Sequence, residues 1–282
     1  MRRSAILISI SAIAVFGSAC SSGSDGKAAE GKGQVSSTEW SASPSADPGS
    51  AVRAAVGAAE KSTARIDEEI RLTNEGKDFT IAVKGIFDMK ADKGRLTASL
   101  GQTGGPAERA VPLDEVFSDG TIYFRMPGER NGDTGWRSTP RDKAEVHSLM
   151  RAPLNDPEHV LRQVAMANDV TEVGQEKVNG TSAVHYRGKL DRKALLLRMA
   201  QDRRAKLETP LEQLGDRLPA FADVWVSKGG QIVRIRLGCD FGDVKVTATV
   251  NLTDHGKPVA APVPPKDAQA VAADSVGGPL TG

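Results

Sequence analysis

Side chains that commonly carry out chemistry are few in this sequence, and their spacing forms no known catalytic or metal-binding motif. The histidines and cysteines are His147, His159, His185, His255, Cys20 and Cys239. No histidine stands at metal-ligand spacing from a second ligand, and a single cysteine besides Cys20 cannot build a zinc site. The sequence also lacks a Gly-x-Ser-x-Gly elbow, a phosphate-binding glycine loop and a His-Glu-x-x-His motif. We therefore expect no catalytic residue, no metal and no cofactor, and only a dyad of scattered residues stays open as an enzymatic alternative.

Other polar and sulfur-containing residues have simple structural interpretations. His185 lies on the polar face of its expected strand, so we expect it to be solvated. The run Asp67-Glu68-Glu69 indicates a solvated strand edge, although Glu68 interrupts an otherwise apolar face. Cys239 lies on the apolar face of a strand, which predicts a buried and unreactive thiol. A disulfide between Cys20 and Cys239 is the alternative in an exported protein.

The N-terminus has the pattern of an export signal that ends at a cysteine. Arg2 and Arg3 precede an apolar run at residues 5–16, which is too short for a stable membrane span. Gly17-Ser18-Ala19-Cys20 resembles a bacterial lipobox, in which the cysteine thiol receives a diacylglyceryl group. Gly17 stands where leucine is usual, which leaves ordinary signal-peptidase cleavage open. We predict a signal peptide at 1–19 and lipidation of Cys20, which would anchor the protein to the extracytoplasmic face of the cell membrane.

The composition predicts one folded domain between two unstructured ends. Residues 20–48 and 262–282 are rich in small residues and proline and show no apolar periodicity, so we predict a lipid-anchored flexible linker and a disordered tail. Residues 49–261 then form the folded domain. Removal of residues 1–19, which hold two arginines and no acid, leaves 35 basic and 36 acidic residues. A nucleic acid partner is therefore not expected, because such partners favour strongly cationic faces.

Alternation of apolar and polar residues at period two predicts that the domain is mostly sheet. The pattern is clearest at 221–252, where three short strands are separated by glycine-containing turns. We expect about nine antiparallel strands, with a few short helices that begin near Ser50, Arg141, Asp156, Asp191 and Leu211. A long sheet with one apolar face must curl around something. The sequence therefore predicts an α+β fold in which an antiparallel open half-barrel sheet wraps around a few helices.

Nine apolar side chains on the expected inner side of this sheet are the candidate lining of a ligand cavity. They are Phe79, Ile81, Val83, Ile122, Phe124, Met126, Val233, Ile235 and Leu237. Each one would serve equally well as an ordinary core residue. Binding sites for acyl chains are apolar with few polar anchors, which agrees with the lack of a polar motif.

Four segments, taken in order, resemble LppX/LprG-type lipoproteins of the actinobacterial envelope. They are Ile122–Pro127 with Gly135-Trp136-Arg137, Val178–Thr181 with Val184–Gly188, Leu218-Pro219 with Val224-Trp225-Val226, and Phe241-Gly242 through Pro262. Ser227 replaces the acid that usually follows the third segment. The resemblance spans most of residues 50–265 and implies a fold similar to the LolA/LolB carriers. It also implies that the protein carries or presents acylated lipids or lipoglycans.

Three functions remain open from the sequence. The first is a membrane-anchored lipoprotein that binds or shuttles a lipid. The second is a tethered interaction or sensor domain whose core is filled, and the third is a secreted enzyme. Small residues on the inner face would favour the first and large ones the second, and Ala82, Ala98 and Ala248 are mixed with Phe79 and Phe87. The sequence leaves the ligand and the oligomeric state open.

Overall fold

Strands dominate the part of the chain that the computed structural model describes, namely residues 47–74, 77–102, 111–126, 135–143, 145, 156, 158–242, 244–260 and 262–272. The strands are β1 (Thr63–Asn74), β2 (Lys77–Asp88), β3 (Lys93–Gln102), β4 (Val111–Ser118), β5 (Thr121–Arg125), β6 (Arg137–Pro140), β7 (Asn168–Val178), β8 (Thr181–Lys189), β9 (Ala220–Ser227), β10 (Ile232–Asp240), β11 (Val244–Thr253) and β12 (Gln269–Ala270). The helices are α1 (Pro48–Ala59), η2 (Arg141–Lys143), α2 (His159–Ala165), α3 (Arg192–Leu195), α4 (Gln201–Leu214) and η3 (Gly215–Arg217).

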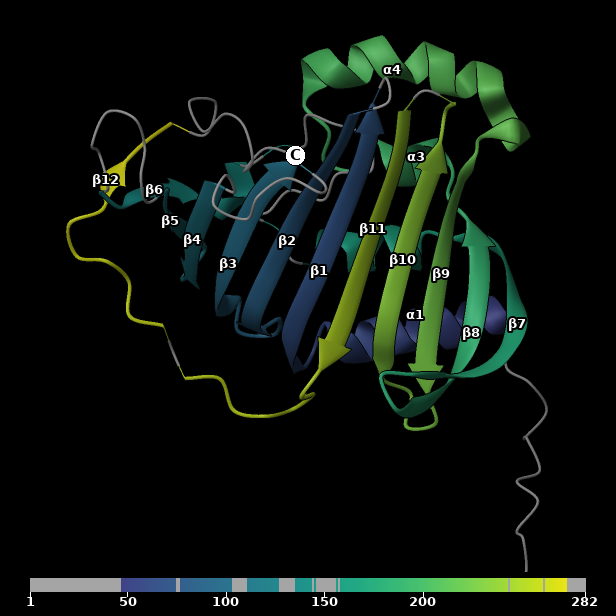
Figure 1. The fold of residues 1–282 in the computed structure, drawn as a ribbon, viewed down its shortest axis with the longest axis horizontal. Helices are drawn as coiled ribbons and strands as arrows, with labels where there is room; N and C mark the ends of the chain where they lie inside the picture. The colour runs from purple at the N-terminus through teal and green to yellow at the C-terminus, as the bar shows by residue number, and fades with distance from the viewer. Residues whose placement is uncertain are drawn as a thin grey trace, which may run out of the picture. The chain divides into compact units, whose positions relative to one another are not determined.

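All twelve described strands belong to one open sheet (Figure 1). Their order is β12-β6-β5-β4-β3-β2-β1-β11-β10-β9-β8-β7, so the edges of the sheet are β12 and β7. Every pair is antiparallel except β12 with β6. The first long strand pairs with the last one, and Ile70 of β1 lies between Ile81 of β2 and Ala248 of β11. The predicted α+β open half-barrel is therefore confirmed.

One face of the sheet, which we call the inner face, packs against α1 and α2. Val52 and Val56 of α1 join one continuous core with side chains of β1 to β5 and β8 to β11. Figure 1 shows α1 behind the strands β8 to β11. The residue that caps α1 is Asp47, whose Oδ2 accepts a hydrogen bond from the Ser50 amide at 2.9 Å, and not Ser50 itself as predicted. Proline at the first helical position, Pro48, fixes this start.

Two other predicted helix starts are wrong. Asp156 was expected to cap a helix, but α2 begins at His159 and the Asp156 carboxylate is buried among arginines. The helix expected from Leu211 begins ten residues earlier as α4, which lies across the ends of the central strands (Figure 1). Leu211 is the buried residue of α4, so the helix lacks the apolar stripe that makes a helix recognisable in sequence.

Two strand predictions also need correction. The tail expected to be disordered from residue 262 contains β12, whose Gln269 lies opposite Arg137 of β6. In β10 the pairing with β9 shifts by one residue between Ile232 and Arg234. Such a bulge reverses the face to which neighbouring side chains point. Ile232 therefore faces the core, and Val233 faces the opposite side of the sheet, which we call the outer face.

Candidate functional site on the inner face

The structure brings most of the predicted cavity residues together on the inner face. Six of them are buried in the main core: Ile81, Val83, Ile122, Phe124, Ile235 and Leu237. Met126 packs against the same core and is partly buried. Val233 does not belong to this set, because the bulge in β10 places it in a small outer cluster with Val178, Ala183 and Trp225. Phe79 shares a face of β2 with Ile81, but its surface is 42% exposed.

Incompletely buried apolar residues lie together at one end of the inner face. Leu72 of β1 lies opposite Phe79 of β2, and Leu100 of β3 lies opposite Ile81, two residues farther along β2. Leu72, Leu100 and Met126 are all partly buried against the core. We call Leu72, Phe79, Leu100 and Met126 the apolar rim. Through this rim the apolar inner surface reaches solvent.

Two glutamates interrupt the apolar inner face, and both are buried. Glu68 is 7% exposed and Glu115 is fully buried. Glu68 lies between Ile66 and Ile70 along β1, so it is not part of a solvated edge as the sequence indicated. Glu115 was missed, although period two along β4 places it on the same face as Leu113 and Phe117. That alternation is the signal that identifies it.

Apolar residues flank both carboxyl groups. Glu68 lies opposite Val83 on one side and Val250 on the other. Glu115 lies opposite Leu96 and Phe124. Within the described part of the chain, Oε1 of Glu68 and both carboxyl oxygens of Glu115 are buried without a hydrogen-bond partner. Burial raises the pKa of Glu68 to about 7. Burial and then the negative charge of Glu68 raise the pKa of Glu115 well above its ordinary value.

Helix α2 carries two more buried polar side chains beside the core. His159 is 2% exposed, and its Nδ1 has no hydrogen-bond partner among the described residues. Burial lowers the pKa of His159 to about 4. Gln163 donates from Nε2 to the Ala194 carbonyl oxygen at 3.1 Å, which ties α2 to α3. The His159 side chain is therefore neutral at neutral pH, and Gln163 positions α2 against α3.

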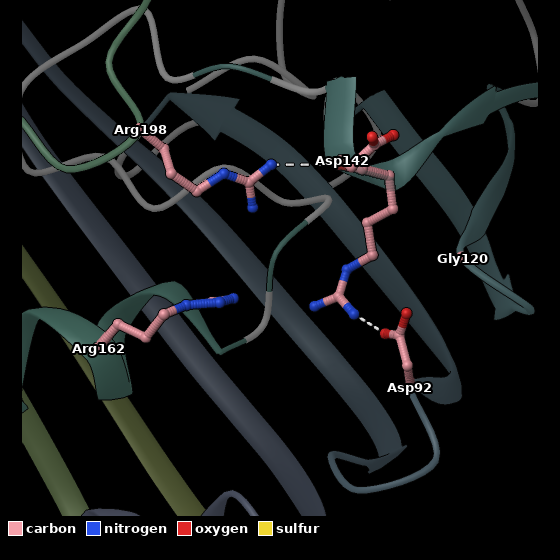
Figure 2. A pocket seen from close by; sticks show the side chains of 6 residues that line it. Asp92, Gly120, Asp142, Arg162 and Arg198 are labelled. Carbon is pink, nitrogen blue, oxygen red and sulfur yellow. Dashed lines mark hydrogen bonds and ion pairs between the residues drawn. The ribbon is translucent and has the colours of Figure 1, made fainter.

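A cluster of arginines surrounds Asp156. The same arginines line a cavity of about 440 Å³, and Figure 2 shows Arg162 and Arg198 at this cavity. The Asp156 carboxylate accepts from Arg162 at 2.8 Å, from Arg141 at 3.2 Å and also from Arg198. Burial alone would raise the pKa of Asp156, but these guanidinium groups lower it below its ordinary value. Asp92 also pairs with Arg141. Because the carboxylates neutralise the charges of the arginines, we interpret this cluster as a set of ion pairs that holds neighbouring loops together and not as an anion-binding site.

A second polar cluster lies on the outer face around a buried histidine. His185 contacts Asp223 through Nε2 at 2.8 Å and Glu176 through Nδ1 at 3.1 Å. Its ring stacks on Trp225 with centroids 4.4 Å apart. The expectation of a solvated His185 is therefore wrong, because Glu176 of the neighbouring β7 and Asp223 of the more distant β9 enclose its ring. No nucleophilic hydroxyl or thiol is hydrogen-bonded to His185 in the described residues, so the cluster lacks the third member of a catalytic triad.

Cys239 is the cysteine among the residues that the structure describes. Cys239 is a buried free thiol in the main core, and burial raises its pKa to about 12. The prediction of a buried, unreactive Cys239 is confirmed. Cys20 lies outside the described residues. Among the described residues, no group of histidine, cysteine and acidic side chains is arranged to hold a metal ion, and no helix is long and apolar enough to cross a membrane.

Comparison with known proteins finds solved structures that are similar to this chain at low sequence identity. No family model and no curated protein matches the sequence. LprF from Mycobacterium bovis matches with a TM-score of 0.46 and 16% identity, over 79% of this chain and 99% of LprF. Lipoprotein LppX from Mycobacterium tuberculosis matches with a TM-score of 0.41 and 13% identity, over 76% of this chain and 98% of LppX. A putative outer membrane lipoprotein-sorting protein domain from Vibrio parahaemolyticus matches with a TM-score of 0.29 and 10% identity, over 74% and 92%.

LprF and LppX are lipoproteins of the LppX/LprG type, which is the type that the sequence motifs resemble. The predicted resemblance is therefore confirmed. Because the TM-scores are below 0.5, we rest no argument on these likenesses. The open half-barrel is established by the order of its strands. Function has to be inferred from the inner face itself.

Proposed function

We propose that the protein is an exported lipoprotein, anchored to the extracytoplasmic face of the cell membrane through Cys20, that binds or shuttles a lipid or acylated ligand on the inner face of its sheet. The apolar rim is the observation that carries this proposal. Phe79 remains 42% exposed although it continues the apolar row formed by Ile81 and Val83. An apolar surface that runs from a core to solvent is typical of a ligand-binding site.

Hydrophobic burial alone would hold such a ligand. Removal of apolar surface from water contributes about 25 cal/mol per Å². An acyl chain that buries a few hundred Å² against the rim and the inner face would therefore gain several kcal/mol. No ionic contact is needed, which agrees with the apolar residues that dominate the face.

One observation favours the second candidate, a tethered interaction or sensor domain with a filled core. Phe87 and Phe117 pack edge to face in the interior, with ring centroids 5.2 Å apart. Both rings are fully buried, so this part of the inner face is closed. If the protein binds a ligand, the ligand would therefore occupy the surface nearer the rim. If the whole core is filled, the inner face would have no space for a ligand.

Mass spectrometry of bound lipids distinguishes the two candidates. The full chain is purified from a bacterial envelope rich in acylated lipids, and the chain from residue 21 onward is produced in the cytoplasm. Organic extracts of both preparations are compared. We expect a stoichiometric acylated species in the envelope preparation beyond the anchor itself. An intact fold that carries no such species would favour the interaction domain.

A pair of variants tests whether the ligand contacts the rim. Phe79→Glu places a charge at the exposed end of the apolar row and should reduce the bound lipid at least tenfold, because a buried carboxylate opposes an acyl chain. Val173→Glu is the matched control, since Val173 of β7 is 57% exposed and lies far from the rim in the strand order. Equal lipid content in the two variants would remove the rim from the site.

A further inference from the structure

We propose that Glu68 and Glu115 form a head-group site on the inner face that takes a primary ammonium group, so that the ligand is an amine-bearing amphiphile. This inference rests on the proposed function, because the apolar part of the ligand occupies the same face. Neither residue belongs to the arginine cluster around Asp156 or to the outer cluster around His185.

The first argument is the position of the two carboxyl groups. Glu115 is fully buried and shares the inner side of β4 with Leu113 and Phe117, which are core residues. Glu68 is more than nine-tenths buried and lies between Ile66 and Ile70 on the same side of β1. Two strands, β2 and β3, lie between Glu68 and Glu115 in the sheet, and the residues that flank both acids belong to the same main core. Both are therefore aimed into one apolar interior.

The second argument is the lack of partners. A buried polar atom without a hydrogen bond costs about 1–3 kcal/mol, so native proteins rarely leave one unsatisfied. Three oxygens of this pair are in that state within the described residues: Oε1 of Glu68 and both oxygens of Glu115. No described arginine, lysine or histidine forms an ion pair with either carboxyl group. These unpaired oxygens indicate a ligand that supplies donors.

The third argument is charge. A phosphate, sulfate or carboxylate head group would bring a negative charge into an apolar interior where no described cation pairs with it, which is strongly unfavourable. A hydroxyl offers one donor, whereas a primary ammonium group offers three donors and a positive charge. Charge-assisted hydrogen bonds to carboxylates are about twice as strong as neutral ones. An ammonium head group therefore suits these unpaired oxygens best and favours the ionised form of the acid that it contacts.

A series of alkyl ligands with equal chains tests the assignment. The mature chain from residue 21 onward keeps every residue that the structure describes. Decylamine, decanol and decyl phosphate are titrated into it by calorimetry, below the concentrations at which they form micelles. We expect decylamine to bind at least about tenfold more tightly than decanol, since one charge-assisted hydrogen bond is of that size. Decyl phosphate should bind most weakly of the three.

Proton release is a second readout that hydrophobic binding would not produce. A carboxyl group that is protonated in the free protein at neutral pH must ionise when an ammonium group binds beside it. Decylamine binding should therefore release protons, seen as a dependence of the binding enthalpy on the ionisation enthalpy of the buffer. Decanol binding should show no such dependence.

Three conservative variants separate the site from general effects. Glu115→Gln and Glu68→Gln keep the shape of the side chain and should each reduce the preference for decylamine over decanol about tenfold. Glu69→Gln is the control, because Glu69 is exposed and pairs with Arg71 on the outer face. Circular dichroism confirms the fold of each variant before titration, and two independent site variants keep the test decisive if one of them unfolds.

The outcomes separate this inference from the proposed function. If none of the three alkyl ligands binds, the proposed function itself fails. If they bind without discrimination, or if decyl phosphate binds most tightly, the inner face holds acyl chains but the ammonium assignment is overturned. If decylamine is preferred equally by the wild type and by both glutamine variants, another group recognises the amine.

Discussion

His185 and Asp223 form a buried contact on the outer face, with Nε2 of the histidine 2.8 Å from Oδ1 of the aspartate. The other carboxylate oxygen of Asp223 accepts from Arg236, through Nε at 3.2 Å and Nη2 at 2.9 Å. Arg187 approaches the same carboxylate at 3.4 Å. Asp223 therefore links the side chains of β8 and β10 across β9, on the side of the sheet that lacks the main core.

Removal of the Asp223 carboxylate should destabilise the fold. Asp223→Ala leaves His185 without a partner in a buried position and separates it from two arginines. Loss of one member of a fully buried ion pair costs about 3–5 kcal/mol, but Arg236 and Arg187 are only about half buried. We therefore expect a loss of about 2 kcal/mol in the free energy of unfolding, measured by urea denaturation. Lys189→Ala removes an exposed pair with Asp169 and should change the free energy of unfolding by less than about 0.5 kcal/mol.

Period two predicted the sheet because each strand obeys it locally. Asn179-Gly180 predicted the hairpin between β7 and β8, and the positive φ of 50° at Asn179 explains why that sequence is favoured. Alternation along residues 224–226 predicts that Trp225 lies on the opposite face from Val224 and Val226, and the structure places it there. Such features depend only on residues that are neighbours in the sequence, so the sequence alone predicts them.

Features that depend on distant pairing could not be predicted from the sequence. The bulge that turns Val233 to the outer face belongs to the pairing of β10 with β9, which the alternation within one strand does not contain. The short strand β12 exists because β6 offers an open edge. His185 looked solvated because Asp223 and Glu176, which enclose it, are 38 and 9 residues away in sequence. The burial of Glu68 likewise comes from the whole inner face.

A glycine in β10 makes room for an aromatic ring on the outer face. Gly238 lies opposite Phe221 of β9, and a Cβ atom added at Gly238 would stand 2.3 Å from the phenyl ring. The ring also lies 4.4 Å from the guanidinium of Arg187, measured from its centroid. Gly238→Ala must therefore displace Phe221 and should lower the free energy of unfolding by about 1–3 kcal/mol.

Gly57 is the control for Gly238, because alanine at Gly57 should stabilise the fold. Gly57 lies within α1, and a Cβ atom there would meet nothing within 4 Å. Gly57→Ala should raise the free energy of unfolding by about 0.8–1 kcal/mol, because alanine has the higher helix propensity. Both variants are compared in one thermal denaturation series. Destabilisation by Gly57→Ala, or none by Gly238→Ala, would contradict the packing described for these two positions.

Lipidation of Cys20 predicts a definite change in membrane attachment. Cys20→Ser removes the thiol that would carry the diacylglyceryl group, and with it the two acyl chains needed for stable anchoring. We expect the wild-type chain in the membrane fraction, with an intact mass increased by the lipid, and the variant chain released or retained as the unprocessed precursor. Cleavage and release of the wild type without a lipid adduct would show that ordinary signal peptidase processes the chain.

The pH dependence of stability reports the burial of Glu68. Its pKa is about 7 in the folded protein and near 4.5 in the unfolded chain. Between these values the folded protein holds a proton that the unfolded chain has lost, so the free energy of unfolding falls as pH rises. His159 acts in the opposite direction, because its pKa is about 4 when folded and near 6.5 when unfolded. Stability from that histidine therefore rises with pH over 4 to 6.5 and offsets part of the loss that comes from Glu68 and Glu115.

The variant Glu68→Gln separates these two contributions. Relative to this variant, the wild type should lose roughly 3 kcal/mol of unfolding free energy as pH rises from 4.5 to 7, which corresponds to the shift in the Glu68 pKa. Urea denaturation at half-unit steps of pH measures the difference directly. Glu69→Gln, whose side chain is exposed on the outer face, should leave the wild-type profile unchanged. A difference that stays constant over this range would mean that the Glu68 carboxyl ionises in the folded protein as it does in water, and the head-group site on the inner face would lose one of its two acids.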